Sequence, residues 1–234
     1  MKNRLQHPEA GNWLAARADR LKDRFQVHAR FYASSKDLRC RDELLITAVR
    51  PIGRSAPQLA DAVFVMMNPG DSKPLTGDDE SAHSKALHAP TRPDLTQYQL
   101  MRVMASFDWD FVRVLNLSDL RTPKSAKLPG LIAEYEQKEG HDGHSIFSPR
   151  RREDLEKALV RRDGAPVIAA WGIRTNLRPL AERALCALQD CQILGLRHST
   201  APWKFLHPLP RKNSAQMAWC NGVNRLVTGR PANC

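Results

Sequence analysis

The segment Ala62-Val-Phe-Val-Met-Met67, followed at once by Asn68-Pro69-Gly70, decides the fold class of this chain. A short, unbroken apolar run is typical of a strand buried on both faces of a sheet. Three more such runs follow at 111–116, 166–171 and 192–196, and segments with helical spacing separate them. Strands that alternate with helices predict a parallel sheet covered on both faces. We therefore expect an α/β fold, namely a three-layer α/β/α sandwich around a central, mostly parallel four-stranded sheet.

The chain that precedes this core has a different pattern. Apolar residues recur at three- and four-residue steps from Leu14 to Phe25, which predicts that the first 35 residues form a helix. A β-rich piece, 44–49, comes next. We therefore divide the chain into an N-terminal helix and β extension, residues 1–58, and an α/β domain, residues 59–234.

Composition limits the classes of function. The chain has 234 residues and a net charge of +11. An excess of basic residues favours polyanionic partners such as single- or double-stranded DNA. A basic surface that only keeps the protein in solution is the alternative. No apolar run approaches the roughly 20 residues of a membrane span, and the N-terminus lacks the apolar core of a secretory signal. Five cysteines without a C-x-x-C pair favour neither disulfides nor a zinc site. We expect a cytoplasmic monomer without a cofactor, a metal or membrane contact.

Polar residues follow the predicted strands where functional groups gather in α/β sheets, at the carboxyl ends. Asn68 ends the first strand, Asn116 ends the second, and Trp171-Gly172 end the third. The loop after the fourth strand reaches His207. These positions are the first candidates for a site.

Four segments, in this order, resemble motifs of the uracil-DNA glycosylase superfamily. Met67–Gly70 resembles the water-activating loop, and Val112–Asn116 resembles the strand whose terminal Asn reads a flipped pyrimidine. Ala169–Gly172 resembles the apolar strand that ends in W-G, and His207–Pro210 resembles the H-P-S-P motif that supplies a catalytic His. The similarity covers residues 60–228. The sequence also resembles an uncharacterised bacterial and phage family with the pattern N-P-S/G, N-L, A-W-G and H-P-L.

The resemblance implies a monofunctional DNA glycosylase, which hydrolyses the N-glycosidic bond of a flipped-out damaged, mismatched or modified pyrimidine and leaves an abasic site. Asn68 would position water, His207 would stabilise the departing base, and Asn116 would read it. The other residues expected to line the base site are Met67, Pro69, Gly70 and Trp171. The residues expected to contact DNA phosphates are Arg211, Lys212, Lys204 and Arg121.

The sequence departs from the superfamily at several places. Classical members carry Asp where Asn68 stands, and a wedge Leu where Arg211-Lys212 follow the H-P motif. The aromatic that stacks on the base is not in its usual place; the candidates are Phe107, Trp109, Trp203 and Phe205. A long polar stretch, 71–94, follows the first motif and could enlarge the pocket, become ordered over DNA, or accept a bulky modified base. Hypermodified phage cytosine, and with it a role in defence against phage, is therefore one possible substrate.

Other interpretations stay open at this point. The chain could bind DNA without catalysis, or hydrolyse free nucleosides or nucleotides, although the latter leaves the +11 charge without a purpose. A metal-dependent hydrolase would use Asp78, Asp79, His83 and His88. Each site residue also has a purely structural role available: Asn68 as a turn cap, Asn116 as a partner for backbone groups at the strand end, and His207 in a surface turn. His141 and His144, in a Gly-containing loop, are expected to be solvated.

Overall fold

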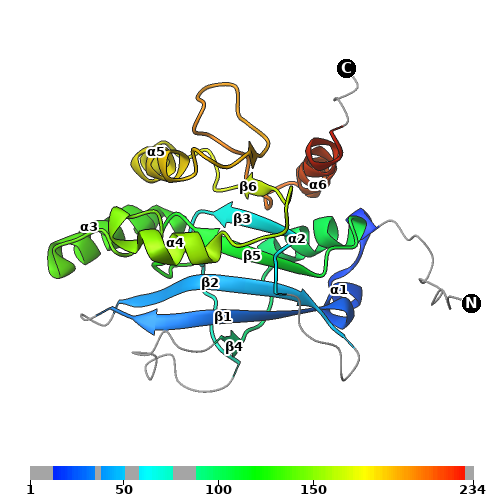
Figure 1. The fold of residues 1–234 in the computed structure, drawn as a ribbon, viewed down its shortest axis with the longest axis horizontal. Coiled ribbons are helices and arrows are strands. Elements are labelled where there is room, and N and C mark those ends of the chain that lie inside the picture. Colours follow the sequence, from blue (N-terminus) through cyan, green and yellow to red (C-terminus); the bar gives the residue numbers. More distant parts are fainter. Residues whose placement is uncertain (1–12, 35–37, 51–57, 76–87, 230–234) are drawn as a thin grey trace, which may run out of the picture.

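The computed structural model describes residues 13–34, 38–50, 58–75 and 88–229. Its strands form one sheet in the order β4-β1-β2-β5-β3-β6-β7, which Figure 1 shows from β4 at one edge upward. The strands are β1 (Phe25–Ala33), β2 (Arg39–Ala48), β3 (Ala62–Met66), β4 (Ala89–Pro90), β5 (Phe111–Asn116), β6 (Val167–Ala169) and β7 (Ile193–Leu194). The α-helices within the described ranges are α1 (Ala18–Arg24), α2 (Leu95–Ser106), α3 (Leu128–Glu139), α4 (Arg152–Ala158), α5 (Arg178–Ala187) and α6 (Asn213–Thr228).

The α/β class is confirmed, but the expected four-stranded, mostly parallel sheet is wrong. The four predicted strands form the parallel half, β5-β3-β6-β7. The other half is antiparallel, because β2 pairs with β5 and β1 pairs with both β2 and β4. The sheet is therefore mixed and has seven strands, and the predicted N-terminal extension and the predicted domain share it.

The N-terminal prediction is wrong because two periodicities overlap at one residue. The helix α1 ends at Arg24, and the chain continues as β1. Phe25, Val27, Ala29 and Phe31 are buried at every second position, as in a strand with one face on the core. Phe25 also continues the helical spacing of Leu14, Ala18 and Leu21, so the first residue of the strand extended the apparent helix.

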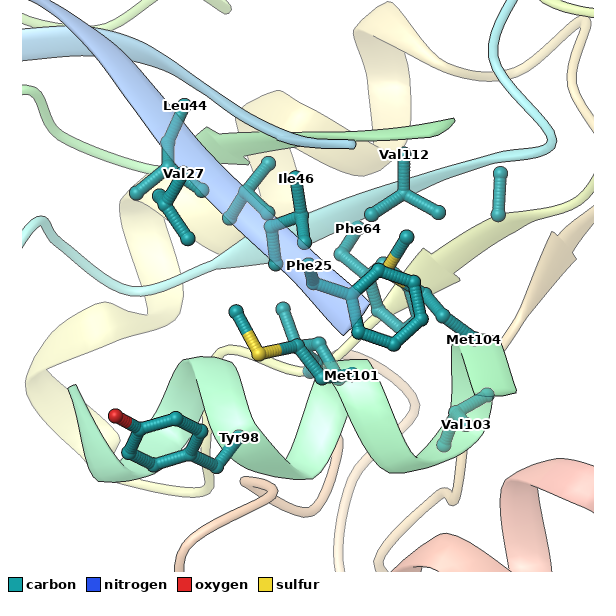
Figure 2. Close-up of a cluster of buried hydrophobic side chains, with 14 of the residues drawn as sticks. Phe25, Val27, Leu44, Ile46, Phe64, Tyr98, Met101, Val103, Met104 and Val112 are labelled. Atoms are coloured by element: carbon teal, nitrogen blue, oxygen red, sulfur yellow. The ribbon is translucent and has the colours of Figure 1, made fainter. Parts of the chain in front are cut away.

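Helices cover both faces of the sheet, and each face has its own apolar core. On one face α2 and α6 pack against the strands; Figure 2 shows Tyr98, Met101 and Met104 of α2 facing Phe64 and the strands β1 and β2. On the other face α3, α4 and α5 pack through a second buried cluster. No helix among the described residues is long and apolar enough to cross a membrane.

The chain order places a crevice at the carboxyl ends of β3 and β5. The chain passes from β3 through α2 to β5 on one side of β3, and later returns to β6 on its other side. Such a reversal of direction is where α/β sheets hold ligands. Asp94 caps α2 at this crevice: its side chain accepts from the Gln97 N–H at 2.8 Å, and the Gln97 side chain accepts from the Asp94 N–H at 3.3 Å.

Candidate active site

A pocket of about 210 Å³ lies at the carboxyl ends of β3 and β5, and the N-terminus of α2 and His207 complete its wall. We call it the strand-end pocket. Asn68, Asn116 and His207, which lie far apart in the sequence, all line it, as do the predicted Met67, Pro69 and Gly70. Pockets for drug-sized ligands measure roughly 300–1,000 Å³. The strand-end pocket is therefore suited to one small ring.

Asn116, the last residue of β5, is completely buried at the pocket wall. Neither Nδ2 nor Oδ1 of its side chain has a hydrogen-bond partner among the described residues. Its backbone position is firmly set, because β3 and β5 pair up to Met66 and Asn116, and the N–H of Leu117 donates to Met66 O at 2.9 Å. The fold thus holds an amide, with one acceptor and two donors, unpaired beside the pocket.

Asn68 lies two residues beyond β3 and is anchored through one side of its amide. Its Nδ2 donates to the carbonyl of Thr122 at 2.9 Å and to that of Leu120 at 3.4 Å. These bonds tie the loop after β3 to the loop after β5. They also fix the orientation of the amide, with Oδ1 left as an acceptor for a water or a ligand, since the described residues give it no partner.

His207 enters the pocket as a neutral imidazole. Its Nδ1 accepts from the N–H of Leu209 at 3.1 Å, so the ring proton lies on Nε2. Burial lowers the pKa of His207 to about 4, because the charged ring would lose its hydration there. At neutral pH the ring therefore offers an N–H donor without a charge.

Trp171 does not line the pocket; it supports the loop that carries His207. Its ring is buried, its Nε1 donates to Trp203 O at 2.9 Å, and it meets Phe205 edge to face. Gly172 adopts φ +100°, which favours glycine, and its backbone bridges to Phe205. Trp171 and Gly172 thus hold the segment 203–207, which carries His207, in place.

Arg41 of β2 is a pocket residue that the sequence reasoning missed. It is 3% exposed, and the one hydrogen bond that its side chain makes to the described residues runs from Nη1 to Pro69 O at 3.5 Å. Burial lowers the pKa of Arg41 to about 10, which still leaves it charged at neutral pH. The sequence gives only a weak indication of this role. The run Arg39-Cys-Arg-Asp-Glu43 places several charges directly before the predicted β-rich piece 44–49.

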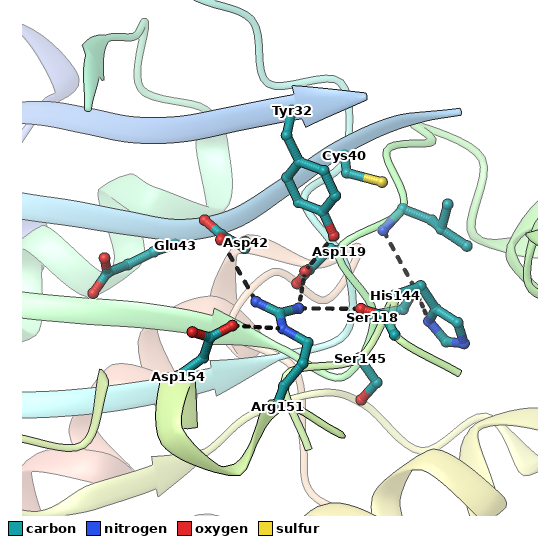
Figure 3. Close-up of polar contacts among 12 residues, drawn as sticks. Tyr32, Cys40, Asp42, Glu43, Ser118, Asp119, His144, Ser145, Arg151 and Asp154 are labelled. Carbon is teal, nitrogen blue, oxygen red and sulfur yellow. Dashed lines mark hydrogen bonds and ion pairs between the residues drawn. The ribbon is translucent and has the colours of Figure 1, made fainter. Parts of the chain in front are cut away.

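A buried polar network holds the loop after Asn116 (Figure 3). Asp119 is ion-paired with Arg151, and its carboxylate accepts from the hydroxyl of Tyr32 at 2.8 Å. His144 is not solvated as expected: its Nδ1 lies 3.0 Å from Ser118 Oγ, and its backbone carbonyl accepts from the Asp119 N–H at 2.7 Å. The 141–144 loop therefore folds inward and buttresses the segment 118–119.

The four predicted phosphate-contacting residues lie at different places. Arg211 and Lys212 are exposed, in the segment that joins the His207 loop to α6. Lys204 bonds Thr200 Oγ1 at 3.1 Å and lies over the ring of Trp203. Arg121 lies over the ring of Phe31, in the loop after β5. Arg211 and Lys212 are thus the freest of the four to meet a polyanion.

None of the four candidate aromatics for stacking on a base lines the strand-end pocket. Phe107 and Trp109 stack on each other at 4.9 Å, and Trp203 and Phe205 are buried near Trp171. The only aromatic ring in the described wall is that of His207, with Met67 and Pro69 supplying apolar surface. A bound ring would therefore rest on these side chains.

The carboxylates and histidines considered for metal binding do not gather in the part of the chain that can be described. Asp78, Asp79 and His83 lie outside the described residues, and His88 bonds Glu43 at 2.9 Å. The described residues contain no group of three His, Cys, Asp or Glu placed to hold a metal ion.

Comparisons with models of protein families, with curated proteins and with solved structures found no match to this chain.

Proposed function

We propose that this protein is a DNA glycosylase whose strand-end pocket receives a flipped-out pyrimidine and hydrolyses its N-glycosidic bond. The observation that carries the proposal is the unpaired, fully buried amide of Asn116 between Asn68 and His207 at one pocket. A buried polar group without a partner costs about 1–3 kcal/mol. A ligand with complementary hydrogen-bonding groups recovers that cost, so the free protein is prepared to bind one.

Asn116 supplies the recognition. The edge of a pyrimidine presents acceptors and donors side by side. An amide can accept from the donor with Oδ1 and donate to the acceptor with Nδ2. The pocket volume of about 210 Å³ suits a single base rather than a whole nucleotide. A base reaches such a pocket only after it leaves the duplex, at a cost of a few kcal/mol.

Asn68 and His207 supply the chemistry. When the bond between C1′ of the sugar and the base nitrogen breaks, its electron pair leaves with the base, and the sugar becomes oxocarbenium-like. The Nε2–H of His207 donates to an oxygen of the departing base as negative charge develops there. A water held by Oδ1 of Asn68 then bonds to C1′ and releases its proton to solvent. Asn68 is a weak base, which suffices because departure of the base largely precedes attack.

The charge and the architecture support the same function. The net charge of +11 suits a polyanion, and Arg211 and Lys212 follow the His207 loop on the surface. Arg121 and Lys204 lie on the loops that flank the site and would add phosphate contacts. The three-layer, glycosylase-like architecture is part of the proposal; the parallel half of the sheet, with helices on both faces, supports it.

The test is a panel of DNAs that contain uracil, mismatched thymine, and hydroxymethylated or glucosylated cytosine, with free nucleosides in parallel. Abasic sites are revealed as strand breaks after hot alkali. We expect breaks on at least one DNA, abolished by Asn68→Ala and retained by Asn224→Ala, since Asn224 of α6 donates to Ser106 of α2 away from the pocket. Salt-sensitive DNA binding without abasic sites would favour a non-catalytic DNA-binding protein. Hydrolysis of nucleosides alone, unaffected by salt, would favour a nucleoside hydrolase.

A further inference from the structure

Arg41 is a buried cation at the strand-end pocket, and the described residues supply it with no counter-ion. Within the described residues, no carboxylate lies within ion-pair distance of its guanidinium. Asp94, which also lines the pocket, Asp119 and Asp42 act on it only from longer range. Its Nε is buried without a partner, and Nη1 meets only the neutral carbonyl of Pro69. Taking an ion out of water costs several kcal/mol unless another charge compensates it.

The fold turns the carboxylate of the next residue in the chain, Asp42, away from Arg41. The pairing of β1 with β2 shifts register so that Asp42 has no partner in β1, which is a bulge. Asp42 is directed to Arg30 at 2.8 Å and Arg151 at 3.5 Å (Figure 3), while Arg41 lines the pocket. The adjacent anion is therefore already engaged elsewhere.

The backbone of Arg41 is held as firmly as that of Asn116. Its N–H donates to Asp119 O at 2.9 Å, and Asp119 belongs to the buried network with Arg151 and Tyr32. The network therefore fixes Arg41 and the loop after Asn116 relative to each other. A second cation, Arg121, lies near enough to add to the positive potential at Arg41.

We propose that Arg41 makes the strand-end pocket a binding site for an anionic oxygen of the ligand. This inference rests on the proposed function for the identity of the ligand as part of a DNA nucleotide. Two sources supply such an oxygen: a carbonyl oxygen of the pyrimidine as it takes up the electron pair of the broken bond, and a phosphate of the nucleotide. In the first case Arg41 is a catalytic residue that stabilises the departing base together with His207.

The two sources are separated by binding measurements on wild type, Arg41→Met and Arg41→Lys. The probes are uracil, 6-azauracil in mildly alkaline buffer, where it is an anion and uracil is neutral, and inorganic phosphate. If the base is the source, wild type binds 6-azauracil on the order of 10- to 100-fold more tightly than uracil, as charge-assisted hydrogen bonds allow. Arg41→Met then loses this preference, and Arg41→Lys keeps part of it.

If phosphate is the source, wild type binds phosphate, Arg41→Met does not, and 6-azauracil shows no preference over uracil. Equal affinity of wild type and Arg41→Met for both anions, or no anion binding by wild type, overturns the proposal. These results do not depend on base excision, so a protein that releases no base but binds an anion through Arg41 would refute the glycosylase function alone.

The melting temperature of the free protein provides a second measurement and a check on folding. Because Arg41→Met removes an unpaired buried charge and keeps most of the side-chain volume, it should raise the melting temperature by a few degrees. A lower melting temperature would show that the guanidinium is already neutralised in the free protein, and would overturn the proposal.

Discussion

Replacing Asn116 with leucine should make the free protein more stable and leave it unable to excise a base. Both polar atoms of the Asn116 side chain are buried without partners among the described residues, and each such atom costs about 1–3 kcal/mol. Leucine is similar in size and needs no hydrogen bond. Allowing for imperfect packing of its branched end, we expect a gain of about 2 kcal/mol in the free energy of unfolding. For a chain of this length that corresponds to about 4–8 °C in melting temperature.

Urea and thermal unfolding of the two proteins measure the gain, and the abasic-site assay measures the loss. A matched control is Gln99→Met, because Gln99 is also buried but its Nε2 donates to Gln216 Oε1 at 3.0 Å. The control should lose about 1 kcal/mol. If Asn116→Leu destabilised the protein as much as Gln99→Met, the amide of Asn116 would be satisfied in the free protein, and the reasoning from its lack of partners would be wrong.

Three further predictions concern the other polar groups. Asn68→Asp should lower both excision and stability, the latter by about 1–3 kcal/mol, because a carboxylate cannot donate to the Thr122 carbonyl as Nδ2 does; faster excision would contradict this. An NMR titration should show His207 with a pKa near 4; the unfolded chain then takes up the proton first as pH falls below 6.5, so stability drops between pH 6.5 and pH 4 by up to about 3 kcal/mol relative to His207→Gln. The double variant Arg211→Ala/Lys212→Ala should weaken DNA binding and reduce the slope of log affinity against log salt by about 2.

The control for the salt experiment is a pair of arginines on α4 and α5, outside the segment that follows the His207 loop. Arg152 and Arg178 are exposed and bond Glu156 and Glu182, one turn along α4 and α5. Replacing both with alanine removes the same charge but no proposed phosphate contact. An equal loss of slope in the control would show that net charge, rather than the surface next to the His207 loop, sets DNA affinity.

The parts of the fold that were predictable from sequence are those with one dominant periodicity. The bounds of β5 agree with the predicted strand 111–116, because a fully buried strand is read from local pattern. Strand β1 was missed because Phe25 suits both the preceding helix and the strand. Without β1, the seven-stranded, mixed sheet could not be predicted. Pairing between distant segments also leaves no local signal in the sequence.

The candidate site was partly predictable for the same reason. Asn68 and Asn116 follow from the rule that strand ends meet, and the pocket brings them together with His207. Arg41 was missed because its contact with the pocket depends on the bulge in β2, and Trp171 was misplaced because the sequence does not reveal which side of a motif faces a ligand. Burial of His144 depends on a loop that folds back toward Ser118, which sequence spacing does not show.

The most direct test of the account is to detect the free base itself. Wild-type protein and the variants Asn116→Leu and Asn224→Ala are incubated with the DNA panel, and mass spectrometry of the small-molecule fraction identifies any released base. We expect wild type and Asn224→Ala, but not Asn116→Leu, to release one pyrimidine in an amount equal to that of the abasic sites. Release of no base from any DNA that the protein binds, or equal release by Asn116→Leu, would contradict it.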